Sequence, residues 1–395
     1  QIDVKTAKAA LFPSLSFSTG HQVVNRPYQE TSSRVSGSEI ISSNSKTSYN
    51  GNYGLNASWT LYNGNKRLKT IQQEKLNNQM AELDVATSEN NIQESIAQVY
   101  IQILYAAESV KVNENTLQVS IAQRDRGQEL LNAGSIAKSD LAQLEAQVST
   151  DRYQLVTAQA TLEDYKLQLK QLLELDGENE MNIYLPALSD ENVLAPLPTK
   201  RDVYISALSL RPEIEASKLN VEASELGINI AKSSYFPTIS LSAGIGTNHT
   251  SGSDFTFGEQ VKNGWNNSIG LSVSMPIFNN RQTKSAVQKA KLQYETSMLS
   301  LLDEQKALYK TIESLWLDAN SAQQRYAAAN EKLKSTQISY ELISEQFNLG
   351  MKNTVELLTE KNNLLQAQQE QLQAKYMAIL NTQLLKFYQG DQLAL

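Results

Sequence analysis

The sequence predicts a mainly α-helical protein with a membrane β-barrel portion, built from a duplicated unit of two strands and a long helical hairpin. Three observations predict this fold: an internal repeat, long uninterrupted heptads and strictly alternating strands. The stretch AKAALFPSLSFSTG at 7–20 recurs as AKSSYFPTISLSAG at 231–244, and LNASWTLYNG at 55–64 recurs as LSVSMPIFNN at 271–280. The separation between the two copies, from 7 to 231 and from 55 to 271, is far longer than the period of solenoid repeats. Each copy therefore contains several elements of its own.

The four strands are expected in two pairs, one pair in each copy. Their approximate positions are 11–20 and 51–62 in the first copy, and 236–246 and 267–278 in the second. Apolar side chains alternate with Ser, Gly, Asn and Thr along each strand, as in outer-membrane barrels, although a half-buried soluble sheet has the same pattern. The residues expected to face lipid are Ile239, Leu241, Leu271, Val273 and Met275.

Aromatic residues flank these strands, as interfacial girdles flank membrane barrels. They are Phe12, Tyr62, Phe236 and Phe278 at the helix-proximal ends and Trp265 at the far end. Four strands cannot close a barrel, and an open sheet edge does not survive in hydrocarbon. We therefore expect copies of the chain to share one barrel, and three protomers would give twelve strands, an even number within the usual range.

A helical hairpin follows each strand pair, at 66–175 in the first copy and 282–390 in the second. From Leu308 to Phe347, apolar or small side chains recur at alternating spacings of four and three, which is a sustained heptad. No Pro or Gly interrupts residues 68–126 or 283–349, so the first arm of each hairpin is expected to be a helix reaching roughly 100 Å. Taken alone, these helices would also fit an ordinary coiled-coil spacer.

Each hairpin turns at a glycine, Gly134 or Gly350, and the helical pattern resumes a few residues later. Glycine adopts the left-handed conformation that ends a helix, and Ser139 or Thr354 can cap the next helix. Each hairpin therefore has its tip far from the strands.

The chain divides into a first repeat at 1–175, a connector at 176–199 and a second repeat at 200–395. The second repeat opens with a helix at 200–232, whereas only QIDVKT precedes the matching motif in the first repeat. We expect the matching helix of the first repeat, any signal peptide and any lipid-anchoring cysteine to belong to a preceding segment.

Composition excludes several classes of function. The net charge of -7 leaves no basic surface for nucleic acid. The absence of cysteine excludes thiol catalysis, thiolate metal sites and disulfide scaffolds. The only histidines, His21 and His249, are expected in or beside polar loops without a third ligand, so we expect no metal site, no cofactor and no enzyme activity.

The duplicated order, the Phe-Pro openings at Phe12 and Phe236 and the tip sequences NAGSIAKSDL and NLGMKNTVEL resemble the TolC-like outer-membrane efflux protein family. The resemblance covers nearly the whole chain. It implies a homotrimer in the outer membrane of a Gram-negative bacterium, with a 12-stranded β-barrel continuing into a 12-helix periplasmic α-barrel. The connector at 176–199 would belong to an equatorial belt around this tube.

The resemblance also implies a function, the exit duct of a tripartite efflux pump or of a type I secretion system. The implied partners are a periplasmic adaptor (a membrane fusion protein) and, through it, an inner-membrane transporter, with small molecules or proteins as cargo. A structural coiled-coil or adhesin-like surface protein without a pore is the alternative from a different class.

The periplasmic gate is implied at the hairpin tips. Asp140 and Glu356 occupy matching positions there, and threefold symmetry would make rings of carboxylates that attract cations. Lys352 stands where a basic residue can tie neighbouring hairpins in a closed state. Each of these side chains could also be an ordinary solvated charge. The resemblance implies adaptor docking at the same tips, at Gly134, Ser135, Gly350 and Met351.

Overall fold

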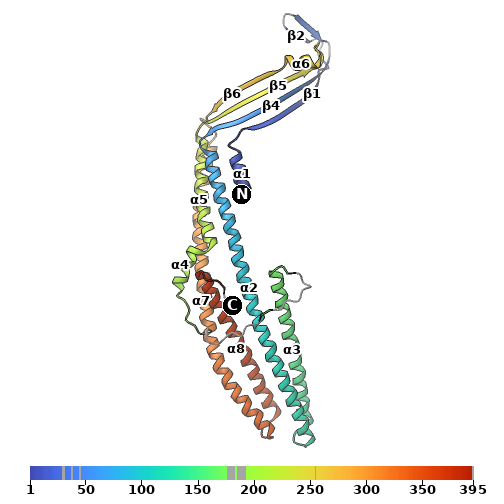
Figure 1. The fold of residues 1–395 in the computed structure, drawn as a ribbon, viewed down its shortest axis with the longest axis vertical. Coiled ribbons are helices and arrows are strands. Elements are labelled where there is room, and N and C mark those ends of the chain that lie inside the picture. The colour runs from blue at the N-terminus through green and yellow to red at the C-terminus, as the bar shows by residue number, and fades with distance from the viewer. Residues whose placement is uncertain are drawn as a thin grey trace. The chain divides into compact units, whose positions relative to one another are not determined.

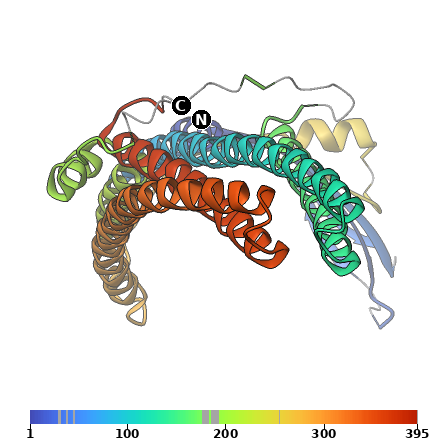
Figure 2. The ribbon, with the colours of Figure 1, turned by 90° about the horizontal axis from the view of Figure 1, so that it is seen from below.

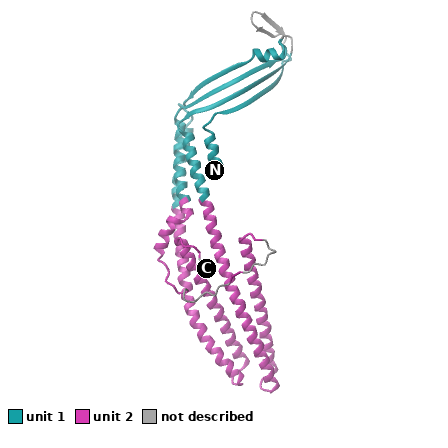
Figure 3. Cartoon of the chain, in the orientation of Figure 1, with its two compact units in different colours: residues 1–82, 216–301 teal, residues 83–215, 302–395 magenta. Residues whose placement is uncertain are grey.

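The computed structural model of the protein describes most of the chain, namely residues 1–28, 32–36, 39–43, 46–175, 183–184, 193–253 and 255–393. The chain forms two compact units, coloured separately in Figure 3: unit 1 is Gln1–Glu82 with Ala216–Leu301, and unit 2 is Leu83–Glu215 with Leu302–Leu395. Among the described residues, no helix is both long and apolar enough to cross a membrane.

Unit 1 contains one four-stranded antiparallel sheet (Figure 1). The strand order is β1-β4-β5-β6, so the second strand of the first repeat pairs with the first strand of the second repeat. The strands are β1 (Ser14–Asn25), β4 (Thr47–Asn63), β5 (Thr238–Thr250) and β6 (Asn266–Ser274). A separate two-stranded ribbon is formed by β2 (Ser32–Ser36) and β3 (Glu39–Ser43). All four expected strands are therefore present.

The pairing register places the expected apolar residues on one face of the sheet. Leu241 pairs with Leu271, and Ile239 pairs with Val273. Leu241 and Ile239 pair in turn with Trp59 and Tyr62 of β4. A bulge between Thr60 and Tyr62 brings Tyr62 onto this face, although its position is out of step with Trp59.

One expectation about the strand ends is wrong. Strand β6 ends at Ser274 and not at 278, so Met275 lies beyond it, and Phe278 follows the strand as a flanking aromatic residue. Pro276 explains this end, because proline has no N–H for the ladder and restricts the residue before it.

The two histidines lie within strands and not in loops, because β1 and β5 extend beyond their expected ends. His21 and His249 both pair with Gly51 of β4, on its two sides. The His21 ring stacks on Tyr49 at 5.8 Å between centroids, and the His249 ring meets Phe257 edge-on at 5.0 Å. Among the described residues, no group of three or more His, Asp or Glu side chains could hold a metal ion.

The helix expected at 200–232 is two helices. They are α4 (Lys200–Leu210) and α5 (Pro212–Lys232), and Arg211 between them has an extended backbone with φ -74° and ψ 123°. Pro212 causes the break, since it disfavours helical geometry at the preceding residue and is well suited to the first turn of a new helix. The described start of the first repeat is a short helix, α1 (Ile2–Ala9), which leads into β1. A further short helix, α6 (Phe257–Asn263), lies between β5 and β6.

Both predicted helical hairpins are present. The first consists of α2 (Lys66–Asn132) and α3 (Lys138–Leu172), and the second of α7 (Gln282–Asn348) and α8 (Thr354–Gln389). Within unit 2, these helices follow one another along an arc when viewed from below (Figure 2).

The heptad seam of α7 is buried, as predicted, at Leu308, Ile312, Ala319, Ala322, Tyr326, Ala329 and Phe347. The two hairpins also pack against each other, because Ala97, Ile101 and Leu104 of α2 form a core with Tyr376, Leu380 and Leu384 of α8.

Most of the connector expected at 176–199 lies outside the described residues. Its described end is held against α7 by backbone carbonyls, which accept hydrogen bonds from long side chains. The Trp316 indole N–H donates to the Pro198 carbonyl at 3.1 Å, and the Gln323 amide donates to the carbonyls of Val193 at 3.0 Å and Ala195 at 2.8 Å. The belt assigned to this segment stays a prediction.

Candidate functional site

The two hairpin tips of unit 2 have the same backbone. The N–H of Ser135 donates to the Leu130 carbonyl at 2.8 Å, and the N–H of Met351 donates to the Gln346 carbonyl at 2.8 Å. These bonds close the first arm of each hairpin in a Schellman motif. The motif requires a left-handed residue, and Gly134 and Gly350 supply it with φ of +73° and +74°. The sequence prediction of glycine turns is confirmed.

The second arms begin one or two residues earlier than predicted. The N-cap residues are Ala137 and Asn353, and not Ser139 and Thr354. At the second tip the Asn353 side chain accepts the Glu356 N–H at 2.9 Å, and the Glu356 carboxylate accepts the Asn353 N–H at 3.3 Å. This reciprocal capping box could have been found from the spacing of Asn353 and Glu356.

The two candidate gate carboxylates are both helix-capping residues. Asp140 takes the same place at the first tip as Glu356 does at the second, and its carboxylate accepts the Ala137 N–H at 3.0 Å. A negative side chain in the first turn of a helix is stabilised by the unpaired N–H groups there. Helix capping therefore explains in part why both tips have an acidic residue at the matching position.

The charges at the two tips differ. Lys352 donates to Glu356 at 2.6 Å within one hairpin, and both side chains are partly exposed. This hydrogen bond, with a smaller contribution from the Asn353 N–H, holds the pKa of Glu356 below its usual value. The first tip has Ile136 at the matching position. The structure thus brings two of the three candidate gate residues together, and it does so within a single tip.

The residues expected to dock an adaptor lie at the exposed tips. Gly134, Ser135 and Gly350 are exposed, and Met351 is 71% exposed. Leu349 beside it is 73% exposed, whereas the first tip has Ala133 at the matching position. The second tip therefore presents an apolar surface that the first tip lacks.

The tips are held together by packing just below them. Leu144, Phe347 and Leu357 form a buried cluster, with Leu130 packed against it. Close approach is possible because α2 has Gly127 here: a Cβ atom on this glycine would lie 2.4 Å from a Leu144 methyl group.

A buried polar cluster, missed by sequence reasoning, lies farther from the tips. The Lys361 ammonium of α8 donates to Asp151 of α3 and to the Ser120 hydroxyl of α2, and Ser120 also donates to Asp151. Gln147 donates to the other Asp151 oxygen at 2.9 Å. The Lys361 and Asp151 side chains are only 4% and 1% exposed. Burial lowers the pKa of Lys361, and the bond to Asp151 opposes that change.

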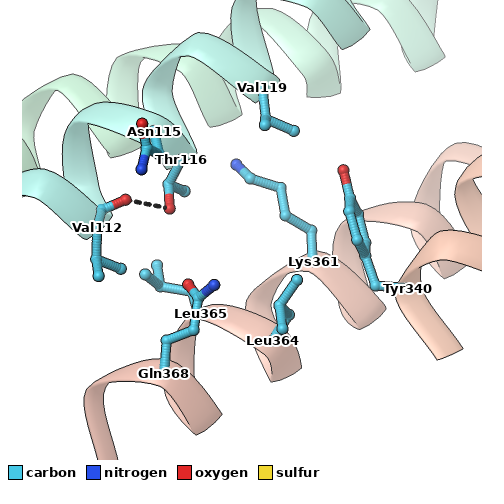
Figure 4. Close-up of a pocket in the computed structure, with 9 residues that line it drawn as sticks. All are labelled: Val112, Asn115, Thr116, Val119, Tyr340, Lys361, Leu364, Leu365 and Gln368. Atoms are coloured by element: carbon cyan, nitrogen blue, oxygen red, sulfur yellow. Dashed lines mark hydrogen bonds between the residues drawn. The ribbon is translucent and has the colours of Figure 1, made fainter. Parts of the chain in front are cut away.

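A small pocket of about 110 Å³ adjoins this cluster (Figure 4). Lys361 reaches across it from α8 toward α2, and Tyr340 of α7 stands beside Lys361. Apolar side chains, including Val119 and Leu365, make up much of the remaining lining. The pocket is therefore a gap between packed helices beside the ion pair, with no further charged side chain among its lining residues.

Of the residues expected to face lipid, Leu271, Val273 and Met275 are exposed in unit 1, and Ile239 and Leu241 are partly exposed. Four of the five expected lipid-facing residues are within strands, and Met275 is not. Tyr62 lies in β4, whereas Phe12 and Phe236 precede β1 and β5, and Trp265 precedes β6. The aromatic residues thus lie at both ends of the sheet, as expected. Their contact with a membrane interface stays a prediction.

Comparison with known proteins agrees with this architecture. A family model described as outer membrane efflux protein matches residues 1–174 and 203–390. A crystal structure of CusC, from work on conformational changes accompanying folding and transmembrane channel formation, superposes with a TM-score of 0.81 at 19% sequence identity, covering 99% of this chain and 86% of the other. The fold is therefore the one found in that channel.

Two relatives share the sequence pattern. The outer membrane efflux protein BepC of Brucella suis biovar 1 (strain 1330) is 24% identical over 294 residues, which covers 74% of this chain and 61% of BepC. The outer membrane protein TolC of Escherichia coli (strain K12) is 24% identical over 294 residues, which covers 72% of this chain and 58% of TolC. The match thus spans about three fifths of the length of these relatives.

These findings confirm the family resemblance and the outer-membrane location expected from the sequence. The matched ranges include both strand pairs and both hairpins, which is most of the chain. The protein therefore belongs to the outer membrane efflux protein family.

Proposed function

We propose that three copies of this chain form one duct, which serves as the exit channel of a tripartite efflux pump or a type I secretion system. The observation that carries this proposal is the sheet of unit 1. Its outer strands β1 and β6 each pair on one side only among the described strands. Unpaired backbone groups cannot lie in hydrocarbon, so a membrane sheet of this kind needs further copies to close it.

The exposed side chains of the sheet support the same conclusion. Ile269, Leu271 and Val273 lie on one face of β6, and each is more than half exposed in the single chain. A row of large apolar side chains on an unpaired edge strand would promote aggregation in water. In an outer-membrane barrel the same row would face lipid.

The gate of this duct is proposed at the hairpin tips. Three copies of Glu356 would form one ring near the threefold axis, and three copies of Asp140 would form another. Rings of carboxylates in a narrow pore attract cations and slow anions. The Lys352 side chain, bound to Glu356 within one tip, would reduce the field of that ring or, on moving to a neighbouring hairpin, would hold the ring closed.

The partners proposed for the duct are a periplasmic adaptor and, through it, an inner-membrane transporter. The docking surface is proposed at the tips, around Gly134, Ser135, Gly350 and Met351. The exposed Leu349 and Met351 side chains support an apolar contact at the second tip. Cargo would be small molecules or proteins.

Planar-bilayer recording of the purified protein tests the duct and its gate together. We expect a cation-selective conductance, with selectivity reduced in Glu356→Gln and, more weakly, in Asp140→Asn. Block by multivalent cations from the periplasmic side should weaken in the same order, because each change removes three charges from a confined ring. Wild-type trimers that insert without conducting would favour a structural coiled-coil protein. Unchanged selectivity and block in both variants would place the constriction elsewhere.

A further inference from the structure

The sheet of unit 1 opens at its helix-proximal end, where β1 and β4 separate. The last pair between these two strands is Ser14 with Ser58, whereas β4 continues to Asn63 beside β5. The residues before Ser14 therefore leave the ladder, and their backbone carbonyls need other hydrogen-bond donors.

Two side chains supply these donors. The Trp59 indole N–H of β4 donates to the Leu11 carbonyl at 2.7 Å. The Arg67 guanidinium of α2 donates to the Ala10 carbonyl at 2.9 Å and also to the Thr60 carbonyl. The start of β1 is thus held to β4 and α2 by side chains, which are longer than a ladder bond and leave space between the two strands.

A pocket of about 260 Å³ lies at this opening. Its lining combines the Arg67 cation with the rings of Trp59 and Tyr62 and with leucines that include Leu61 and Leu68. The Trp59, Leu61 and Leu68 side chains are exposed, so the pocket is open to the surroundings of the protein. The volume is below the roughly 300 to 1,000 Å³ of sites for drug-sized ligands, so the pocket suits a smaller group.

The charge of Arg67 is not neutralised within the pocket. Arg67 is the only charged residue among the described residues of the lining, and the first turn of α2 contains no acidic residue. A guanidinium has five N–H groups, of which the two carbonyls take two. Arginine binds phosphate through two parallel hydrogen bonds, and enough N–H groups remain for them. The pocket therefore suits a ligand that joins an anionic phosphate to an apolar part.

The second repeat lacks this combination of side chains. Adding 216 to a residue number here gives the equivalent position, which is Met275 for Trp59 and Thr283 for Arg67. Met275 lies beyond β6, and the buried Thr283 hydroxyl accepts a hydrogen bond from the Asn279 amide at 2.5 Å. The cation and the indole are thus specific to the first repeat and are not required by the shared turn from strand to helix.

We propose that this pocket binds the phosphate group of a phospholipid in the periplasmic leaflet of the outer membrane. The inference rests on the proposed duct, in which the helix-proximal end of the sheet lies at that leaflet. Trp59 pairs with Leu241 in the ladder, on the face proposed to meet lipid, and indoles are favoured at headgroup depth. Arg67 donates to the phosphate oxygens, and the leucines contact the beginning of the acyl chains. Because Arg67 also holds the start of β1, a bound lipid stabilises this junction of sheet and helix.

Native mass spectrometry of the purified protein in mild detergent counts the phospholipids on each trimer. Wild-type trimers should retain one per chain, and Arg67→Gln trimers should lose them. Glutamine can still donate to a carbonyl, so this variant removes the charge with little change to the fold. Lys66→Gln removes a neighbouring charge that does not line the pocket and is the matched control. Leu68→Glu, at an exposed position, places a carboxylate at the pocket and should also lower retention.

Short-chain lipids identify the group that is recognised. Dihexanoyl phosphatidylglycerol should bind Arg67→Gln trimers at least about tenfold more weakly than wild-type trimers, because a charge-assisted hydrogen bond is lost. Dihexanoylglycerol, which has no phosphate, should bind weakly to both. Inorganic phosphate at the same concentration should not displace the phospholipid.

Equal retention in the wild-type protein and Arg67→Gln, or equal binding of dihexanoylglycerol and the phospholipid, would overturn the phosphate site. Displacement by inorganic phosphate would assign the pocket to a free anion and would overturn the lipid. Wild-type trimers without phospholipid would overturn the site and leave the duct intact, whereas wild-type protein found only as monomers would contradict the proposed function itself.

Discussion

The sheet and the hairpins of this protein have diverged to different degrees between the two repeats. In the sheet, the strand pairs of both repeats share one register. In the hairpins, the turns also share their backbone, but the charged side chains differ between equivalent positions. The first repeat has Ile136 where the second has Lys352, and Glu145 where the second has Lys361. The two repeats have thus kept the strand register and the backbone of the turns. The charged side chains that differ between them are those whose contacts are made by one hairpin and not by its equivalent.

The largest effect is expected from breaking the buried pair of Lys361 and Asp151, which joins the two repeats. The equivalent positions hold Glu145 and Ala367, so there is no second pair of this kind. Lys361→Ala would leave the Asp151 carboxylate buried without its cation, which costs about 3 to 5 kcal/mol. Thermal or denaturant unfolding of the detergent-solubilised protein, followed by circular dichroism, measures this loss. The matched control is Glu145→Ala at the equivalent exposed position, where a change within about 0.5 kcal/mol is expected.

A double substitution tests whether the loss of stability in Lys361→Ala comes from the unpaired Asp151 charge. Lys361→Met combined with Asp151→Leu removes both charges and fills their space with apolar groups, so stability should return close to that of the wild-type protein. If Lys361→Ala and Glu145→Ala unfold alike, the buried pair contributes nothing that an exposed charge does not. If the double variant is as unstable as Lys361→Ala, the hydrogen bonds of Ser120 and Gln147 matter more than the charge.

A smaller effect is expected from the two faces of the sheet. Val273→Arg places a charge on the face proposed to meet lipid and should cost roughly 2 to 4 kcal/mol of barrel stability. Ser272→Arg, one residue earlier, places the same side chain on the inner face and should be milder. Heat-modifiable migration of the folded trimer on gels compares the two variants. Equal loss, or greater loss at Ser272, would mean that the lipid-facing and inner faces are reversed.

The periodic elements of this fold were predictable because each depends on local pattern. Alternation over strand β6 predicted a strand with one apolar face, and heptads over helix α7 predicted a helix with a buried seam. The structure has both. The break at Arg211 was also available from the sequence, since Pro212 follows it directly. Met275 was misplaced for a similar reason, because Pro276 was treated as part of a regular alternation.

The candidate site was less predictable. Asp151 lies on the apolar seam of α3 between Val148 and Leu155, and Lys361 lies on the seam of α8 between Leu357 and Leu364. A charged residue on such a seam indicates a buried partner. Its identity depends on which helix of the other repeat packs alongside, and no pattern within one helix contains that information. The Lys352 bond to Glu356, by contrast, is the ordinary spacing of four residues in a helix turn.

The smallest effect is expected at the second tip, where acid should loosen the start of α8. The pKa of Glu356 is lowered in the folded protein, first by the Lys352 hydrogen bond, so its stabilising contribution is complete above the usual glutamate pKa of 4.5 and is lost as the pH falls through the lowered value.

Hydrogen exchange read by mass spectrometry on peptides covering Asn353 and Glu356 tests this, between about pH 6 and about pH 3. After correction for the intrinsic pH dependence of exchange, the wild-type protein should lose protection there on acidification, whereas Glu356→Gln should start less protected and change little. Lys352→Met should shift the loss of protection to higher pH, because it removes the main cause of the lowered pKa. The first tip is the internal control, since Ile136 cannot bind Asp140. Identical pH profiles in the wild-type protein and in Lys352→Met would show that the ion pair does not act on the cap, and the two tips would then differ in sequence but not in electrostatics.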